Sequence, residues 1–133
     1  MNAQYISFFQ KFHLVDNQII ELLIEKTLLR TYKKGDLITK EGDIQKNLFL
    51  VEEGVQMSFY NHDGKQHVIA FTYPPSVSGI PDSFFFQKPS KFELQAVTDS
   101  KLRGISYENL QKLLDQSHSL ERLFRKMTEF RLW

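Results

Sequence analysis

The chain has 133 residues, a formal net charge of +1 and no cysteine, and 41% of its residues are hydrophobic. This length and composition fit one folded domain and exclude a disordered or collagen-like chain. The absence of cysteine excludes a disulfide scaffold, a thiolate zinc site, a cysteine-ligated iron–sulfur cluster and a cysteine nucleophile. The near balance of 17 basic and 16 acidic residues gives no overall electrostatic signature of nucleic-acid binding.

The first residues carry no targeting signal. Residues 1–5 have neither a basic region nor the start of a long apolar region, as a signal peptide requires. The longest uncharged stretch, residues 66–81, is interrupted by three prolines and a glycine, so it does not fit a membrane-spanning helix. We therefore expect a cytoplasmic protein that makes no membrane contact.

Residues 1–27 are predicted to be helical. Ile6 and Phe9 begin a short apolar turn, and Asp16 stands where a helix N-cap is expected. Residues 19–24 then supply a broad apolar face of helical spacing.

Residues 28–106 are predicted to form several short antiparallel strands. Turn signals recur between short apolar runs, four of them around glycines that we interpret as structural: Gly35, Gly42, Gly54 and Gly64. One hairpin is well specified, because Val55, Met57 and Phe59 alternate with polar residues before a turn at residues 61–64 and a return strand over about 66–73. Residues 92–96 and 101–106 are predicted to be two further strands. This pattern is typical of an antiparallel sandwich or barrel.

Helical spacing returns in residues 107–133. A first amphipathic helix has Tyr107, Leu110 and Leu113 on one face, and a second helix follows. In the second helix the apolar residues are spaced as in a coiled-coil seam, so we predict a dimer interface there. Its residues are Leu120, Leu123, Phe124, Met127 and Phe130. The alternative is that this helix packs on its own barrel, as amphipathic helices usually do.

No catalytic or metal-binding pattern is recognisable. The four histidines, His13, His62, His67 and His118, show no spacing suited to a shared metal ion. The sequence also lacks a G-x-S-x-G nucleophile motif, a phosphate-binding P-loop and a dinucleotide fingerprint. We therefore expect no enzyme activity, no metal and no cofactor.

The segment from Pro74 to Pro89 is the strongest candidate for a ligand site. A short helical turn that begins after Pro81 or Asp82 is expected to offer free backbone N–H groups to an anion. The run Phe84-Phe85-Phe86 cannot place all three rings on one side, so at least one ring should line a cavity or cover the core. The alternative is a long loop that closes the core.

The turn motifs resemble those of the cyclic-nucleotide-binding-domain superfamily. The resemblance rests on Lys34-Gly35-Asp36-Leu37-Ile38, on Glu41-Gly42-Asp43, on residues 48–51 leading to Gly54, and on Ile105-Ser106-Tyr107. Within that superfamily the chain is similar to the N-terminal effector domain of Crp/Fnr-type transcription regulators. The resemblance implies a mainly β fold with flanking helices: an antiparallel β jelly roll (a double-stranded β-helix) and a long C-terminal dimerisation helix. It divides the chain into N-terminal helices (1–27), a sensor barrel (28–106) and C-terminal helices (107–133), with a DNA-binding helix-turn-helix domain expected beyond residue 133.

The sequence departs from this family where cyclic AMP or cyclic GMP is held. Members that bind these nucleotides have a Gly-Glu pair for the ribose hydroxyl and an Arg-Ser or Arg-Thr pair for the cyclic phosphate. Alignment through Gly79 places Ile80 at the glutamate position and Ser90-Lys91 at the arginine–serine position. Lys88 or Lys91 offers only a point charge, which does not reproduce the fork geometry of arginine.

The resemblance and these departures from it predict an effector-sensing and dimerisation domain of a Crp/Fnr-like regulator that does not bind cyclic AMP or cyclic GMP in the usual way. The predicted pocket consists of Ser78, Gly79, Ile80, Asp82, Phe85, Ser90 and Lys91. The predicted partners are a second copy of the chain, an unidentified small-molecule effector, and DNA only through the further domain. The alternative is a cupin-like barrel or enzyme that binds a small molecule, which is weakened by the missing histidine pair.

Overall fold

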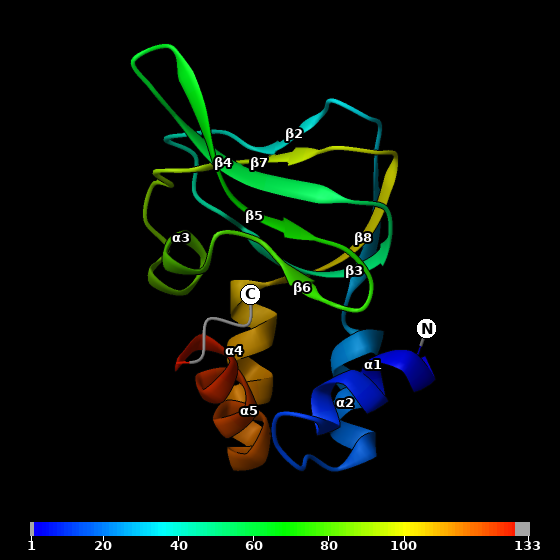
Figure 1. Ribbon diagram of the computed structural model, residues 1–133. Helices are drawn as coiled ribbons and strands as arrows, with labels where there is room; N and C mark the ends of the chain where they lie inside the picture. Colours follow the sequence, from blue (N-terminus) through cyan, green and yellow to red (C-terminus); the bar gives the residue numbers. More distant parts are fainter. Residues whose placement is uncertain (1, 130–133) are drawn as a thin grey trace.

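The computed structural model describes residues 2–129, which form a β sandwich with two pairs of helices at one end (Figure 1). The helices are α1 (Asn2–Gln10), α2 (Asn17–Glu25), α3 (Pro81–Phe86), α4 (Tyr107–Gln116) and α5 (His118–Glu129). The strands are β1 (Leu28–Tyr32), β2 (Leu37–Thr39), β3 (Asn47–Glu53), β4 (Gln56–His62), β5 (Lys65–Thr72), β6 (Val77–Ser78), β7 (Glu93–Ala96) and β8 (Ser100–Ser106).

The strands form two four-stranded sheets, in the orders β1-β8-β3-β6 and β2-β7-β4-β5, and neighbouring strands are antiparallel. The prediction of a mainly β fold with an antiparallel jelly roll and flanking helices is therefore confirmed. Strand β6 lies at the edge of one sheet and β5 at the edge of the other. A cavity described below lies between these two strands.

The predicted hairpin is present as β4 and β5, with His62 opposite Lys65 across the turn. Asp63 and Gly64 both have positive φ, as a tight hairpin turn requires. The predicted alternation along β4 is wrong at one position, because Gln56 is fully buried. The register of the hairpin shifts between Ser58 and Phe59, so one alternating pattern does not run through the whole strand.

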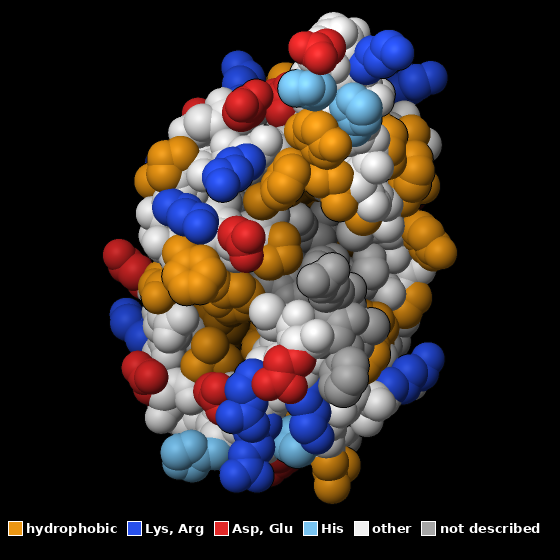
Figure 2. All heavy atoms as spheres, turned by 60° about the vertical axis from the view of Figure 1, so that its left-hand side comes forward, with side chains coloured by type: hydrophobic (Ala, Val, Ile, Leu, Met, Phe, Trp, Pro, Cys, Tyr) orange, Lys and Arg blue, Asp and Glu red, His pale blue; other side chains and the backbone are white. Residues whose placement is uncertain are grey.

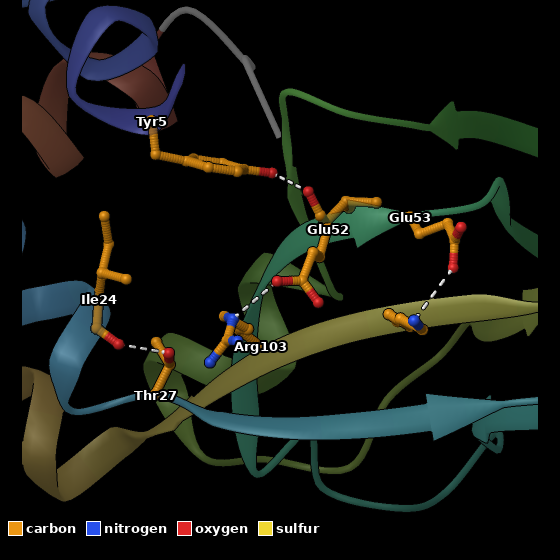
Figure 3. Close-up of polar contacts among 8 residues, drawn as sticks. Tyr5, Ile24, Thr27, Glu52, Glu53 and Arg103 are labelled. Atoms are coloured by element: carbon orange, nitrogen blue, oxygen red, sulfur yellow. Dashed lines mark hydrogen bonds and ion pairs between the residues drawn. The ribbon is translucent and has the colours of Figure 1, made fainter. Parts of the chain in front are cut away.

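The helices at residues 1–27 dock onto the barrel through one tyrosine. Asp16 caps α2 as predicted, its side chain accepting a hydrogen bond from the backbone N–H of Gln18. The hydroxyl of the fully buried Tyr5 donates a hydrogen bond to the backbone carbonyl of Val51 in β3 (Figure 3). It also lies 3.1 Å from the carbonyl oxygen of Ser76, in the segment between β5 and β6. Helix α1 is thereby tied to β3 and to the segment that leads into β6.

A second polar contact stabilises the strands next to this helix. The Nε atom of Arg103 in β8 lies 3.1 Å from a carboxylate oxygen of Glu52 in β3, and both side chains are partly buried (Figure 3). Partial burial makes such an ion pair less exposed to screening by salt than a surface pair.

The apolar stripe of α5 lies inside the chain's own core. The side chains of Leu120, Leu123, Phe124 and Met127 are between 0% and 3% exposed and belong to one cluster with residues of α1, α2 and α4. These four residues, which we expected at a dimer interface, therefore do not offer a free surface to a second chain. The physical reason is that the N-terminal helices cover this face of α5. Phe130, the fifth expected residue, lies outside the described residues.

Candidate functional site

The site is a cavity of about 190 Å³ between the edge strands β5 and β6. Helix α3 begins at its rim, since Pro81 and Asp82 belong both to the cavity lining and to the first turn of α3. The lining residues are Ser58, Ile69, Ala70, Thr72, Ser78, Gly79, Ile80, Pro81, Asp82, Phe92 and Leu94. Four of the seven predicted pocket residues, Ser78, Gly79, Ile80 and Asp82, are thus together at this cavity.

One wall of the cavity is part of a chain of hydrogen-bonded polar side chains that are buried or partly buried. The hydroxyl oxygens of Thr72 and Ser78 lie 2.9 Å apart. The Thr72 hydroxyl also donates to the side-chain oxygen of Gln56 at 2.9 Å, and the amide nitrogen of Gln56 donates to the Ser100 hydroxyl at 3.0 Å. Thr72 and Gln56 were not predicted from the sequence as residues of the site. Gln56 was assigned to the polar side of its strand, and nothing in the alternation marks it as buried.

The predicted phosphate-binding positions lie beside this cavity, in a cleft of only about 40 Å³. Ser90 and Lys91 line the cleft together with Ile80 and Asp82. The Ser90 hydroxyl donates to the backbone carbonyl of Phe92 at 2.7 Å and accepts from the backbone N–H of Phe92 at 3.1 Å. Ser90 is 4% exposed, so its hydroxyl is already engaged in closing a turn of its own segment.

Two lysines, Lys88 and Lys91, belong to the lining of this cleft. The Nζ atom of Lys88 lies 5.3 Å from the centroid of the Phe86 ring, which is a cation–π contact on the surface. Lys88 and Lys91 are both exposed. No buried cation therefore stands at the cleft among the residues that the structure describes.

Helix α3 is short, and side chains of the helix and of its C-cap hold it in place by bonding the backbone of Gln45 in a distant loop. The hydroxyl of the buried Ser83 accepts from the backbone N–H of Gln45 at 2.8 Å and donates to the carbonyl of Lys88 at 2.6 Å. The Gln87 side chain donates to the carbonyl of Gln45 at 3.2 Å. The first turn of α3 contains Pro81, which has no N–H, and the Asp82 carboxylate. This composition does not favour the anion site that we expected at the start of this helix.

The three consecutive phenylalanines face different surroundings, as expected. Phe84 is fully buried and its ring lies 5.8 Å from that of Tyr107, whereas Phe86 is 71% exposed. Phe85 does not line the barrel cavity. It lines a groove of about 440 Å³ between α3 and the helices α4 and α5. Figure 2 shows the face on the α3 side, where hydrophobic side chains are exposed next to acidic and basic ones.

Helix α3 therefore separates two hollows. Its first residues, Pro81 and Asp82, line both the barrel cavity and the groove, while Phe85 and Phe86 line only the groove. The far side of the groove is made by residues of α4 and α5, among them Leu114 and Phe124.

The histidines do not gather into a site. Within residues 2–129 there is no group of three or more His, Cys, Asp or Glu side chains that is arranged to hold a metal ion. His67 stacks on Tyr60 with ring centroids 4.9 Å apart, and His62 lies 3.3 Å from the Asp63 carboxylate near the tip of the hairpin. His13 lies 3.0 Å from the ammonium of Lys126. Desolvation and the neighbouring cations Lys126, Arg122 and Arg125 lower the pKa of His13.

None of the helices in the part of the chain that the structure describes is long and apolar enough to cross a membrane.

The comparison with protein families gives one match. The model of the cyclic nucleotide-binding domain matches residues 29–117, which is more than half of the chain. No curated protein matches the chain.

Similar folds are found among solved structures of transcription regulators. The catabolite activator protein of Thermus thermophilus has a TM-score of 0.82 at 23% identity, covering 91% of this chain and 57% of that protein. The N-terminal domain of a transcriptional regulator from Streptomyces coelicolor A3(2) has a TM-score of 0.72 at 24% identity, with coverage of 89% and 82%. The c-di-GMP responsive global regulator CLP of Xanthomonas campestris has a TM-score of 0.72 at 23% identity, with coverage of 85% and 56%. At these identities the likeness shows the fold. The chain spans little more than half the length of the Thermus and Xanthomonas proteins.

Proposed function

The chain belongs to the cyclic nucleotide-binding domain family, and from this premise we propose that it is the effector-sensing domain of a Crp/Fnr-like transcription regulator that does not hold cyclic AMP or cyclic GMP in the usual way. The order of N-terminal helices, jelly roll and C-terminal helices supports the regulator class, since solved regulators have the same fold. The family match and these neighbours favour a regulatory role over the cupin-like enzyme considered from the sequence.

The proposal that cyclic nucleotides are not bound in the usual way rests on the hydrogen bonds that the Ser90 hydroxyl already makes. A phosphate held in a protein interior needs charge-assisted hydrogen bonds, each of which contributes about 1.5–3 kcal/mol. The hydroxyl of Ser90 carries no charge and already bonds the backbone of Phe92. The cleft beside it, at about 40 Å³, has room for little more than a water molecule.

The position expected to bind the ribose hydroxyl also lacks a hydrogen-bonding group. Ile80 is 4% exposed and its side chain belongs to an apolar cluster with Phe49, Val51 and Leu94. An aliphatic side chain accepts no hydrogen bond from a ribose hydroxyl. Both anchoring interactions of a cyclic nucleotide are therefore missing at the aligned positions.

The proposed mechanism of signalling uses α3 as the moving wall. A ligand in the barrel cavity contacts Pro81 and Asp82, and the same helix presents Phe85 to the groove of α4 and α5. A ligand that binds one position of α3 better than another shifts the population of the C-terminal helices. The output would reach DNA through a helix-turn-helix domain that follows the C-terminal helices.

We keep dimerisation through the C-terminal helix as part of the proposal, but on the exposed face of α5. Glu121, Arg122 and Arg125 lie on that face, since the apolar face is buried in the chain. Sedimentation of the chain should give the mass of a dimer, and Arg122→Glu combined with Arg125→Glu should reduce it to that of a monomer. A wild-type chain that sediments as a monomer at high concentration would overturn this part.

Titration calorimetry with cyclic AMP and cyclic GMP tests the ligand part. We expect no measurable heat of binding to the wild-type chain. The double variant Ile80→Glu with Ser90→Arg introduces a carboxylate and a guanidinium at the two aligned positions. Its binding of both nucleotides is compared with that of the wild-type chain. Micromolar binding of either nucleotide to the wild-type chain would contradict the proposal.

A further inference from the structure

The size of the barrel cavity limits what it can hold. Its volume is about 190 Å³, whereas sites for drug-sized ligands have roughly 300–1,000 Å³. An apolar protein cavity of about 150 Å³ binds a single benzene ring. The cavity therefore fits a molecule of about one ring.

Most of the cavity wall is apolar. Ile80 and Leu94 are almost completely buried, Phe92 is partly buried, and Ile69 is half exposed at the mouth. A ligand in the cavity removes its own apolar surface, and the exposed parts of Ile69 and Phe92, from water, which favours binding by roughly 25 cal/mol per Å² before the entropy of binding is subtracted. The body of the ligand is accordingly apolar.

The polar part of the wall offers hydrogen-bond acceptors. Thr72 has one hydroxyl proton and two oxygen partners, the amide oxygen of Gln56 and the hydroxyl of Ser78. Gln56 is fully buried, so an amide oxygen without a donor there would be costly, and the Thr72 proton is best placed on it. The Ser78 hydroxyl then donates to Thr72, which leaves the lone pairs of Ser78 to accept from a ligand.

The charge of the cavity lining disfavours an anionic ligand. Among the described residues that line the cavity, Asp82 is the one ionisable side chain, and no Lys or Arg is present. Lys88 and Lys91 line the neighbouring small cleft, to which Asp82 also belongs. An anionic ligand would meet a carboxylate without a cation in the cavity itself, and a neutral or cationic ligand would not.

We infer that the cavity between β5 and β6 binds a single-ring, mainly apolar molecule that has a hydrogen-bond donor and no negative charge. This inference rests on the proposed function, because it names the class of effector for the same cavity. The polar group of the ligand lies at Ser78 and Asp82, and its ring lies against Ile80 and Leu94.

Three probes of one size test the inference: benzyl alcohol, benzylamine and benzoate at neutral pH. Each is titrated into the isotope-labelled chain, and the backbone amide signals of Thr72, Gly79 and Leu94 are followed by NMR. Benzyl alcohol and benzylamine should shift these signals to saturation, and benzoate should bind at least tenfold more weakly. Equal binding of benzoate, or no shift with any probe up to the limit of solubility, would overturn the inference.

Matched variants measure separately what Ser78, Asp82 and Lys91 contribute to the binding of the probes. Ser78→Ala should weaken benzyl alcohol several-fold, whereas Ser76→Ala should not, because the Ser76 hydroxyl bonds the carbonyl of Tyr73 and lies outside the cavity lining. Asp82→Asn should reduce the discrimination against benzoate. Lys91→Gln should leave it unchanged, and a large effect of this variant would place the polar group in the neighbouring cleft instead.

The outcome is distinguishable from a failure of the proposed function. Micromolar binding of cyclic AMP would contradict the proposed function. Equal binding of the three ring probes, without cyclic AMP binding, would contradict only the ligand class.

Discussion

The ring of Phe9 in α1 lies 6.1 Å from the ring of Phe124 in α5, so the first and the last helix of the described chain share one core. This contact shows that the apolar stripe of α5, which is spaced like a coiled-coil seam, packs on helices of the same chain. The seam is filled by helices of the same chain. The energetic consequences differ from those of a dimer interface and are measurable.

Leu123→Ala should lower the free energy of unfolding by about 2–5 kcal/mol, because it removes a fully buried side chain from the core. Lys112→Ala, at an exposed position on the neighbouring helix α4, should change it by about 0.5 kcal/mol or less. Urea denaturation at two protein concentrations measures both. A Leu123→Ala chain of unchanged stability but lower sedimentation mass would instead place this residue at an interface between chains.

Tyr5→Phe should destabilise the chain by about 1–3 kcal/mol, because the carbonyl of Val51 loses its buried donor. Tyr73→Phe is the matched control, since Tyr73 is 61% exposed. Thermal or urea unfolding of the two variants should rank Tyr5→Phe well below Tyr73→Phe. The same stability in both would show that the hydroxyl of Tyr5 does not hold α1 to the barrel.

The titration of Tyr5 gives an alkaline limit of stability. Burial raises its pKa to about 12, although the hydrogen bonds with Ser76 and Val51 act in the opposite direction. The unfolded chain loses this proton near pH 10 and the folded chain only near pH 12, so the free energy of unfolding should fall as pH rises between these values. Tyr5→Phe should flatten this part of the stability profile. An unchanged slope in the variant would assign the loss to other groups.

The titration of His13 should lower the free energy of unfolding as the pH falls, which is the opposite of the effect of Tyr5. Its pKa is lowered by desolvation first and then by Lys126, Arg122 and Arg125. The unfolded chain therefore takes up a proton at a pH where the folded chain does not, so stability should fall as pH drops below about 6.5. His13→Gln should reduce the slope between pH 7 and 5, and His62→Gln at the exposed end of the hairpin is the comparison. A larger effect of His62→Gln would contradict the assignment.

Gly54→Ala should be more harmful than Gly42→Ala. Both glycines have positive φ, near +94° and +92°, a conformation that is unfavourable for alanine by about 1–2 kcal/mol. At Gly54 the added Cβ would also lie 2.4 Å from the backbone oxygen of Asp99, whereas at Gly42 it would meet nothing within 4 Å. Melting temperatures of the two variants measure the difference. Equal destabilisation would mean that the segment at Asp99 moves aside without penalty.

The sequence was sufficient to predict the fold because local patterns and turn residues agree with it. The hairpin of β4 and β5 follows from an alternating strand and a turn at Asp63-Gly64, and the cap of α2 follows from Asp16. These features depend on neighbours in sequence. The family resemblance then supplied the jelly-roll architecture, in which the remaining strands pair over long separations.

The site was predictable only in part. The positions Ile80 and Ser90 follow from alignment, and the structure shows what occupies them. The burial of Gln56 depends on a bulge and on Thr72 and Ser100, which lie far away in sequence. The assignment of the α5 stripe to the core depends in the same way on the packing of α1, which helical spacing does not reveal.

The two-sided position of α3 has a consequence for how such a domain changes its specificity. Pro81 and Asp82 belong to the lining of the barrel cavity and also to that of the groove beside α5. A substitution that refits this helix to another effector therefore also alters its packing against the C-terminal helices. On the proposed function, ligand choice and output therefore change together, and a laboratory redesign of one requires a compensating change in the other.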